Sequence, residues 1–286
     1  MKSILKLSST APTPAIHFLT GELPVEGKLH RDVFSLFFGV WNNPDTKIYE
    51  ILKYLLKTSL DNSRTWAVHL RHLCKRYGLE DPLVYLSKDP PTRSSWKELI
   101  ATKITAYFEN KLRSAASTNS LMGFLNTYSC GLRGRHHPAL ANMFTTWEVR
   151  KSRSHLKFLS GNYLTYKVKA DQSGGSARCR ICETGADETI SHVISTCQGL
   201  AVEREKILAD FSKLCTITKN NIIFEDFLES EHQLCQFILD PTSLNLSTRV
   251  SVQDPLLPQF YKLSRDFCHV IDNTRIRLLN ELAENK

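Results

Sequence analysis

The sequence has no hydrophobic run long enough to cross a membrane. A membrane helix needs roughly 18 consecutive apolar residues, and the longest apolar run, Val33 to Trp41, is about half that length. The opening MKSILKLSSTAPTP contains no adequate apolar core for a secretory signal. These absences predict an intracellular protein of the nucleus or cytoplasm that does not enter a membrane.

Internal repeats and low-complexity tracts are also missing from the sequence. The hydrophobic fraction of 42% and the charged fraction of 23% are ordinary for a globular protein, which argues against wholesale disorder. The 286 residues suffice for one large domain or two modest ones.

The cysteines lack the clustering of a disulfide framework. Five of the eight are scattered singly, most of them in apolar stretches of helical pattern, and this predicts reduced, buried thiols. These five are Cys74, Cys130, Cys215, Cys235 and Cys268. The other three cysteines lie close together near His192.

Apolar residues recur at helical spacing along most of the chain, which predicts a mainly α fold. We expect a bundle-like helical domain over residues 1–125. A second domain, 126–286, would hold a basic segment, a Cys/His module and C-terminal helices. Asn43 is the expected cap of a helix through KIYEILKYLLK, and Ser95 with Glu98 predicts a capping box. The alternation in NYLTYKVKA, residues 162–170, suggests a strand.

Positive charge is concentrated in one part of the sequence. Residues 131–170 contain eight lysines and arginines against one acid, whereas residues 198–240 contain eight acids against four bases. The basic stretch predicts either a polyanion-binding face or an ordinary solvated surface. The cations predicted to contact nucleic acid are Arg133, Arg135, Arg150, Lys151, Arg153, Lys157, Lys167, Lys169, Arg178 and Arg180.

The strongest motif is CRICETGADETISHVISTC, residues 179–197, which has the frame C-x2-C-x9-H-x4-C. Zinc prefers thiolate and imidazole ligands in a closed tetrahedron, and C-x-x-C is a common half-site. The predicted ligands are Cys179, Cys182, His192 and Cys197. Cys197 has to lie at a helix end, because α-helical positions five apart diverge by about 140°. A redox C-x-x-C or a chance group of core cysteines is the alternative.

The frame predicts a structural metal rather than a catalytic one. Four protein ligands leave no open position for water or substrate. A zinc deaminase would need a glutamate two residues after the histidine, where Ile194 stands, and a C-x-x-C downstream of it. We therefore expect structural Zn²⁺ and no enzymatic activity.

The order of a helical region, a basic aromatic stretch and the Cys/His frame resembles the C-terminal, post-polymerase region of non-LTR (LINE-type) retrotransposon reverse transcriptases. The segments PAIHFLTGELPVEGKLHRDVFSLFFGVWNNPDTKI and HLKFLSGNYLTY extend the resemblance over most of the chain. It implies a tail that helps to hold template RNA or target DNA, with the polymerase portion as a further partner. The paired aspartates of a polymerase are missing, and no nuclease motif follows the frame.

Two readings of function remain open at this stage. One is a zinc-stabilised module that binds RNA or DNA; the other is a protein-interaction or scaffold module that uses the acidic helices after Cys197.

Phe158, Tyr163 and Tyr166 are candidates either for base stacking or for the core. GLRGRHHP, residues 131–138, is either a phosphate loop or a basic turn, and the turn is favoured. His69, His72 and Cys74 could also ligate a metal, but ordinary helix-face residues are the favoured interpretation because no fourth ligand is visible nearby.

Overall fold

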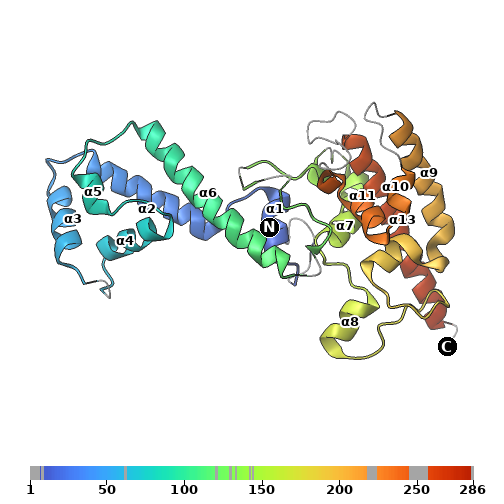
Figure 1. The fold of residues 1–286 in the computed structure, drawn as a ribbon. Coiled ribbons are helices and arrows are strands. Elements are labelled where there is room, and N and C mark those ends of the chain that lie inside the picture. The colour runs from blue at the N-terminus through green and yellow to red at the C-terminus, as the bar shows by residue number, and fades with distance from the viewer. Residues whose placement is uncertain are drawn as a thin grey trace. The chain divides into compact units, whose positions relative to one another are not determined.

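The computed structural model confirms a mainly α-helical fold with a small Cys/His module followed by helices (Figure 1). It describes residues 7, 10–60, 63–119, 122–128, 131, 132, 134–141, 143, 145–217, 224–244 and 257–284. Within these ranges there is no β-strand, and one isolated antiparallel bridge joins Arg178 and Asp187.

The residues group into two compact units. The central unit is Glu22–Ser114, and the terminal unit combines Met1–Gly21 with Ala115–Lys286. The sequence-based division instead fell between residues 125 and 126. Residues 13–20 group with the second half because the backbone N–H of His137 donates to the Leu19 carbonyl and that of Gly134 to the Gly21 carbonyl, both at 2.9 Å.

The central unit is built around aromatic side chains. The indole of Trp96 lies within 6.4 Å, centroid to centroid, of the rings of Phe34, Phe37 and Trp41, and its Nε1 donates to the Phe34 carbonyl. The helices of this unit are α2 (Val25–Trp41), α3 (Lys47–Thr58), α4 (Trp66–Arg76), α5 (Pro82–Leu86) and α6 (Arg93–Ser117), the last of which ends just beyond it.

Two expected helix starts in the central unit are wrong. Helix α3 begins at Lys47 with Thr46 as its cap, not with Asn43, because the Thr46 hydroxyl accepts from the Tyr49 backbone. Helix α6 begins at Arg93, and Thr92 accepts from the Ser95 backbone. Ser95 therefore lies inside the first turn, where it cannot serve as the predicted capping-box residue.

The terminal unit is organised by the long helix α13 (Leu257–Glu284) (Figure 1). It packs against α7 (Thr146–Leu159), α9 (Ala201–Ile217) and α11 (Glu231–Leu239). Phe158, Phe211, Phe237, Phe260 and Phe267 fill the core of the unit and are almost completely buried. In the described residues, the other helices of this unit are α1 (Thr13–Thr20), α8 (Tyr166–Ser173) and α10 (Glu225–Leu228). The short turns η2 (Pro138–Leu140), η3 (His192–Thr196), η4 (Gln198–Leu200) and η5 (Pro241–Leu244) connect them.

Residues 162–170 do not form the expected strand. The Thr165 hydroxyl accepts from the Val168 backbone and caps α8, while Gly174, at φ +76°, ends it. The alternation of apolar and polar residues favours a strand, but the Thr165 cap and the contact of Glu188 with the Tyr166 backbone hold the first helical turn.

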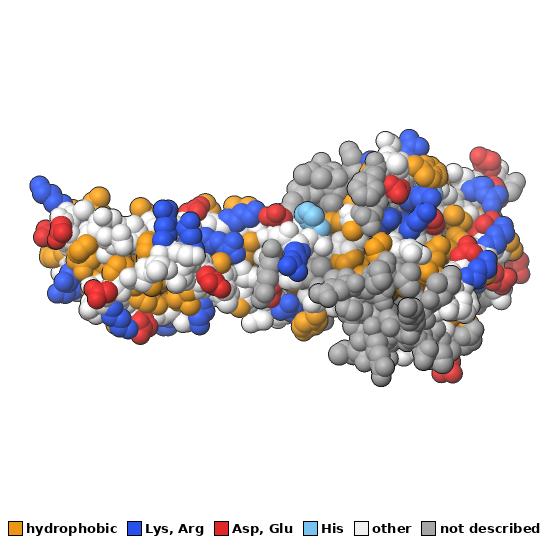
Figure 2. Space-filling model, turned by 90° about the horizontal axis from the view of Figure 1, so that it is seen from above, with side chains coloured by type: hydrophobic (Ala, Val, Ile, Leu, Met, Phe, Trp, Pro, Cys, Tyr) orange, Lys and Arg blue, Asp and Glu red, His pale blue; other side chains and the backbone are white. Residues whose placement is uncertain are grey.

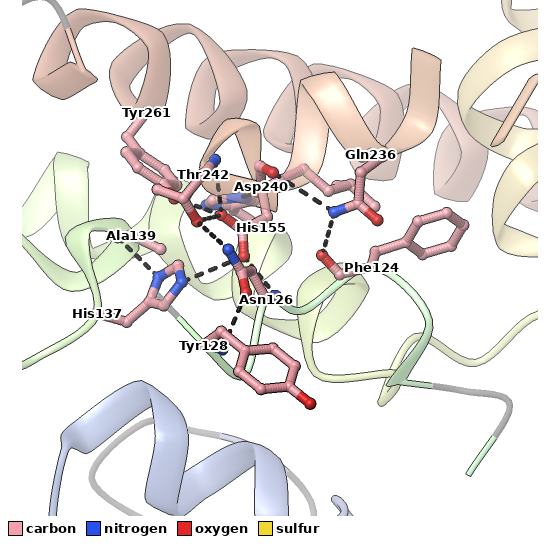
Figure 3. Close-up of polar contacts among 11 residues, drawn as sticks. Phe124, Asn126, Tyr128, His137, Ala139, His155, Gln236, Asp240, Thr242 and Tyr261 are labelled. Atoms are coloured by element: carbon pink, nitrogen blue, oxygen red, sulfur yellow. Dashed lines mark hydrogen bonds and ion pairs between the residues drawn. The ribbon is translucent and has the colours of Figure 1, made fainter. Parts of the chain in front are cut away.

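A buried polar network ties Asn126 and His137 to the helices of the terminal unit (Figure 3). Asp240 is fully buried and accepts from the Asn126 backbone and the Tyr261 hydroxyl, both at 2.7 Å, and its Oδ2 lies 3.2 Å from His137 Nε2. Burial opposes ionisation of Asp240, but the electrostatic interaction with His137 and the hydrogen bonds from the Thr242 and Tyr261 hydroxyls lower its pKa overall. The network therefore holds Asn126 and His137 in place, although both residues lie outside the helices.

Four of the five scattered cysteines, Cys74, Cys215, Cys235 and Cys268, are buried and unbridged as expected, and Cys130 lies outside the described residues. Among the described helices, none combines the length and apolar character that crossing a bilayer requires.

Candidate metal centre

The C-x-x-C half of the frame lies in a short hairpin-like loop. The Cys179 backbone N–H donates to the Ala186 carbonyl and the Glu188 N–H to the Ala177 carbonyl, both at 2.8 Å. These two bonds close the loop that contains Cys182, and the Cys182 sulfur lies 3.1 Å from the Thr184 hydroxyl. The loop thus directs both thiols toward the same side.

The second half of the frame lies on one turn of π-helix, His192–Thr196. The Cys197 backbone N–H donates to the His192 carbonyl at 2.7 Å, a bond from residue i+5 to residue i. The wider turn brings positions five apart to the same face, which an α-helix does not do. The expectation that Cys197 follows the helix end is met, and the π turn is the reason that its thiol reaches His192.

The four predicted ligands come together in the structure. The ligand atoms of Cys179, Cys182, His192 and Cys197 all lie within 4.8 Å of one another. The sulfurs of Cys179 and Cys197 are 3.9 Å apart, and the Cys182 sulfur is 3.4 Å from His192 Nε2. This arrangement can hold one metal ion with four protein ligands.

Burial and neighbouring groups shift the pKa values of all four side chains. Burial raises the pKa of the Cys179 and Cys197 thiols, and the neighbouring thiols raise that of Cys197 further. Burial opposes ionisation of Cys182 too, but hydrogen bonds from Thr184 lower its pKa. Burial also lowers the pKa of His192, which keeps the imidazole neutral. A metal cation stabilises buried thiolates and requires a neutral imidazole.

Neighbouring residues orient the ligands. The Thr196 hydroxyl lies 3.2 Å from His192 Nδ1, and this contact leaves Nε2 as the nitrogen directed at Cys182. The buried Arg204 side chain donates to the Cys197 carbonyl at 2.9 Å. A Cβ placed on Gly199 would lie 2.2 Å from the Ile181 carbonyl oxygen, so the chain after Cys197 passes directly against the C-x-x-C loop.

A buried ion pair joins the Cys/His module to α13. The Arg275 guanidinium donates to both carboxylate oxygens of Glu188, with Nε at 3.0 Å and Nη2 at 2.7 Å. The same carboxylate accepts from the Tyr166 backbone at the start of α8. Burial opposes the charge of Arg275, but the hydrogen bonds that it donates to Glu188 raise the pKa of this guanidinium overall. Glu188 thus connects the metal loop, α8 and α13.

Folding separates the ten predicted nucleic-acid contacts into different classes. Three are paired with acids: Lys151 with Asp266 at 2.5 Å, Lys157 with Asp272 at 3.6 Å and Lys167 with Asp171 at 3.2 Å. Arg153 is half-buried, and Arg133 lies outside the described residues. The remaining five are exposed and have no ion pair with an acid in the described part of the chain: Arg135, Arg150, Lys169, Arg178 and Arg180.

Two of these exposed cations gather around Tyr166, next to the metal loop. The Arg180 guanidinium carbon lies 4.6 Å from the centre of the Tyr166 ring, and the Lys169 ammonium lies 5.1 Å from it. Tyr166 itself is half-exposed. On the face drawn in Figure 2, by contrast, lysine and arginine side chains are interspersed with acidic ones.

The other aromatic candidates are core residues. Phe158 and Tyr163 are buried, and their rings stack with centroids 3.7 Å apart.

The segment 134–137 packs on the end of α1, where the ring of His136 lies 2.8 Å from the Thr20 carbonyl. A Cβ on Gly21 would meet the Arg135 carbonyl at 2.2 Å. These contacts favour the basic turn over a phosphate loop.

No second group of metal-binding side chains, including one at His69, His72 and Cys74, occurs in the ranges that the structure describes.

Comparisons with protein-family models, with curated proteins and with solved structures found no match for this chain. Function therefore has to be inferred from the residues of the site themselves.

Proposed function

We propose that the chain is a zinc-stabilised nucleic-acid-binding module without catalytic activity of its own. The resemblance to the post-polymerase region of LINE-type reverse transcriptases favours RNA or DNA as the ligand, with the polymerase portion of such a protein as a further partner. One observation carries the proposal: Lys169 and Arg180 lie over the ring of Tyr166, beside the four-ligand centre. Neither cation has an acidic partner in the described residues.

Zinc is the metal that these ligands suit best. A tetrahedral ion with zinc–sulfur bonds of about 2.3 Å and zinc–nitrogen bonds of about 2.0 Å separates two sulfurs by about 3.8 Å and a sulfur and a nitrogen by about 3.5 Å. The observed separations of 3.9 Å and 3.4 Å agree with these values. Three thiolates and one imidazole complete the coordination shell, so the metal would hold the loop in shape and activate no water.

The metal would act on function through the loop that it holds. Arg178 and Arg180 flank Cys179, so their backbone is fixed when the thiol is coordinated. Lys169 and Tyr166 are positioned against the same loop through Glu188, which accepts from the Tyr166 backbone. Several cations fixed at one place form a surface on which a phosphate backbone can bind.

The test is the salt dependence of binding to a short single-stranded oligonucleotide. Each lost phosphate contact reduces the slope of log K against log salt by about 0.7. The double variant K169Q/R180Q should therefore bind more weakly and lose about 1.4 from the slope. The control K206Q/K213Q removes the same charge from exposed positions on α9 that are paired with Glu203 and Asp210, and it should leave the slope unchanged.

Equal slopes for the two double variants would remove this surface as the binding site. A zinc-loaded protein that shows no salt-dependent affinity for RNA or DNA, but forms a stable complex with another protein, would favour the scaffold function instead.

A further inference from the structure

A pocket of about 580 Å³ opens beside the metal loop within the terminal unit. Tyr166 and Arg180 line it on the side of α8 and the C-x-x-C loop. Leu279, Leu282 and Ala283, from the last turns of α13, line the other side. The pocket therefore has one cationic, aromatic wall and one aliphatic wall.

The cationic wall is pre-organised. The Arg180 guanidinium lies 4.6 Å from the centre of the Tyr166 ring, a distance typical of a cation on an aromatic face. Arg275 also lies 6.0 Å from this ring centre, but its charge is engaged by Glu188. The charge of Arg180 has no such partner in the described residues, so its planar group remains available to a ligand.

The aliphatic wall is partly exposed. Leu282 keeps 42% of its surface accessible, and Leu279 is half-buried. A ligand that covers these side chains removes apolar surface from water. A ligand that stacks on the guanidinium of Arg180 has to be planar. To form an ion pair with Lys169 as well, it needs a negatively charged group next to the planar one. An unpaired nucleobase with its flanking phosphates meets all three conditions.

We propose that this pocket takes one unpaired nucleobase of a single-stranded nucleic acid. The base stacks on the guanidinium of Arg180 and covers Leu279 and Leu282, while Lys169 contacts an adjacent phosphate. The inference deepens the proposed function and depends on it. It adds a preference for single strands, because the bases of a duplex are stacked and paired and cannot enter.

Three ligands separate base recognition from phosphate binding: an oligothymidylate of about 12 nucleotides, the same strand with every base removed, and the corresponding dA·dT duplex. Binding of each to the zinc-loaded full chain is measured by fluorescence anisotropy at several ionic strengths, and the affinities of the three ligands are compared at the same ionic strength. Phosphate contacts alone favour the duplex, whose charge density is about twice that of one strand. We expect the oligothymidylate to bind roughly tenfold more tightly than the abasic strand, and more tightly than the duplex.

Two variants with a matched control locate the effect. R180K keeps the charge but loses the guanidinium plane, so it should lose the tenfold preference for bases and keep the salt slope. A283L fills the pocket without altering charge and should weaken binding of the oligothymidylate only. A209L, at an exposed position on α9, is its control and should bind as the original chain does.

Equal affinity for the oligothymidylate and the abasic strand, together with a normal salt slope, would overturn the base pocket and leave nucleic-acid binding intact. Absence of salt-dependent binding to all three ligands would overturn both proposals. Unchanged base preference in A283L and R180K would also reject this pocket.

Discussion

Gly199 shows how one residue without a side chain can determine the shape of the metal centre. It follows Cys197 by two positions, and its α-carbon lies so close to the Ile181 carbonyl that an added Cβ would be 2.2 Å from the oxygen. The clash is with backbone, which cannot rotate away as a flexible side chain can. The position therefore couples the two halves of the ligand frame.

We expect the substitution Gly199→Ala to weaken metal binding by at least about tenfold, the scale of losses seen when groups around the ligands are altered. The added methyl group would push the C-x-x-C loop away from Cys197 and separate the sulfurs. Competition with a chromogenic chelator measures the change in affinity.

The matched control is Gly39→Ala in α2, where a Cβ meets nothing within 4 Å. Alanine is the better helix former, so this variant should be more stable by up to about 1 kcal/mol and bind the metal unchanged. Equal metal affinity in both variants would show that the contact at Gly199 does not constrain the ligands.

The convergence of the four Cys and His side chains could be predicted from the sequence because the C-x2-C-x9-H-x4-C frame is a local and specific pattern. The residues that support them could not. Glu188 and Arg275 are 87 positions apart, and nothing in either segment indicates that they meet. Thr196 and Gly199 lie within or beside the frame, so their proximity was visible but the direction of their contacts was not.

At the scale of elements, helices with a clear apolar period were predictable and their ends were less so. Thr46 and Thr92 replace Asn43 and Ser95 at the starts of α3 and α6, because several nearby residues are competent caps. The error at α8 has another cause: its sequence suits a strand, but Glu188 accepts from the Tyr166 backbone and holds the first turn. This contact across 22 residues acts together with the Thr165 cap, and only the cap belongs to the local sequence.

The ion pair between Glu188 and Arg275 is expected to be the main link between the metal loop and α13. Removing one partner of a buried pair typically costs about 3–5 kcal/mol, because the other charge stays buried and unpaired. We therefore expect E188Q and R275M each to lower the free energy of unfolding by about 3 kcal/mol or more, as measured by urea denaturation with zinc present.

The double variant E188Q/R275M tests whether the two losses have a common origin. It leaves no uncompensated charge, so its loss should be smaller than the sum of the single losses by more than about 1 kcal/mol. Additive losses would mean that the two side chains stabilise the fold independently.

At the scale of the whole molecule, the local excess of positive charge did not become one continuous basic surface. Lys151 and Lys157 turn to Asp266 and Asp272 on α13, more than a hundred positions away. The sequence showed how many cations the segment contains but not which acids fold onto them. The exposed cations near the metal loop are therefore a better guide to a binding surface than net charge.

Because the metal ligands all belong to the terminal unit, metal removal should affect that unit selectively. We expect chelation to lower the unfolding temperature of one calorimetric transition by about 10 °C, for zinc present at roughly a thousandfold its dissociation constant. Hydrogen exchange should accelerate in α8 and in residues 192–197, while α2 and α4 keep their protection.

Readdition of zinc is the control and should restore both the transition and the slow exchange. Loss of protection in α2 and α4 on the same scale would show that the central unit depends on the metal as well. A zinc content near zero in the purified chain would contradict the metal assignment itself.

In the π turn at His192–Thr196, the spacing between the two ligands and the hydrogen-bond pattern of the backbone depend on each other. A spacing of five requires the wide turn, whereas a spacing of four would place both ligands on one face of an ordinary α-helix. Transferring this frame onto an ideal helical scaffold would therefore fail unless one residue were deleted between His192 and Cys197. The number of residues between His192 and Cys197, rather than their identity, therefore determines the type of helical turn.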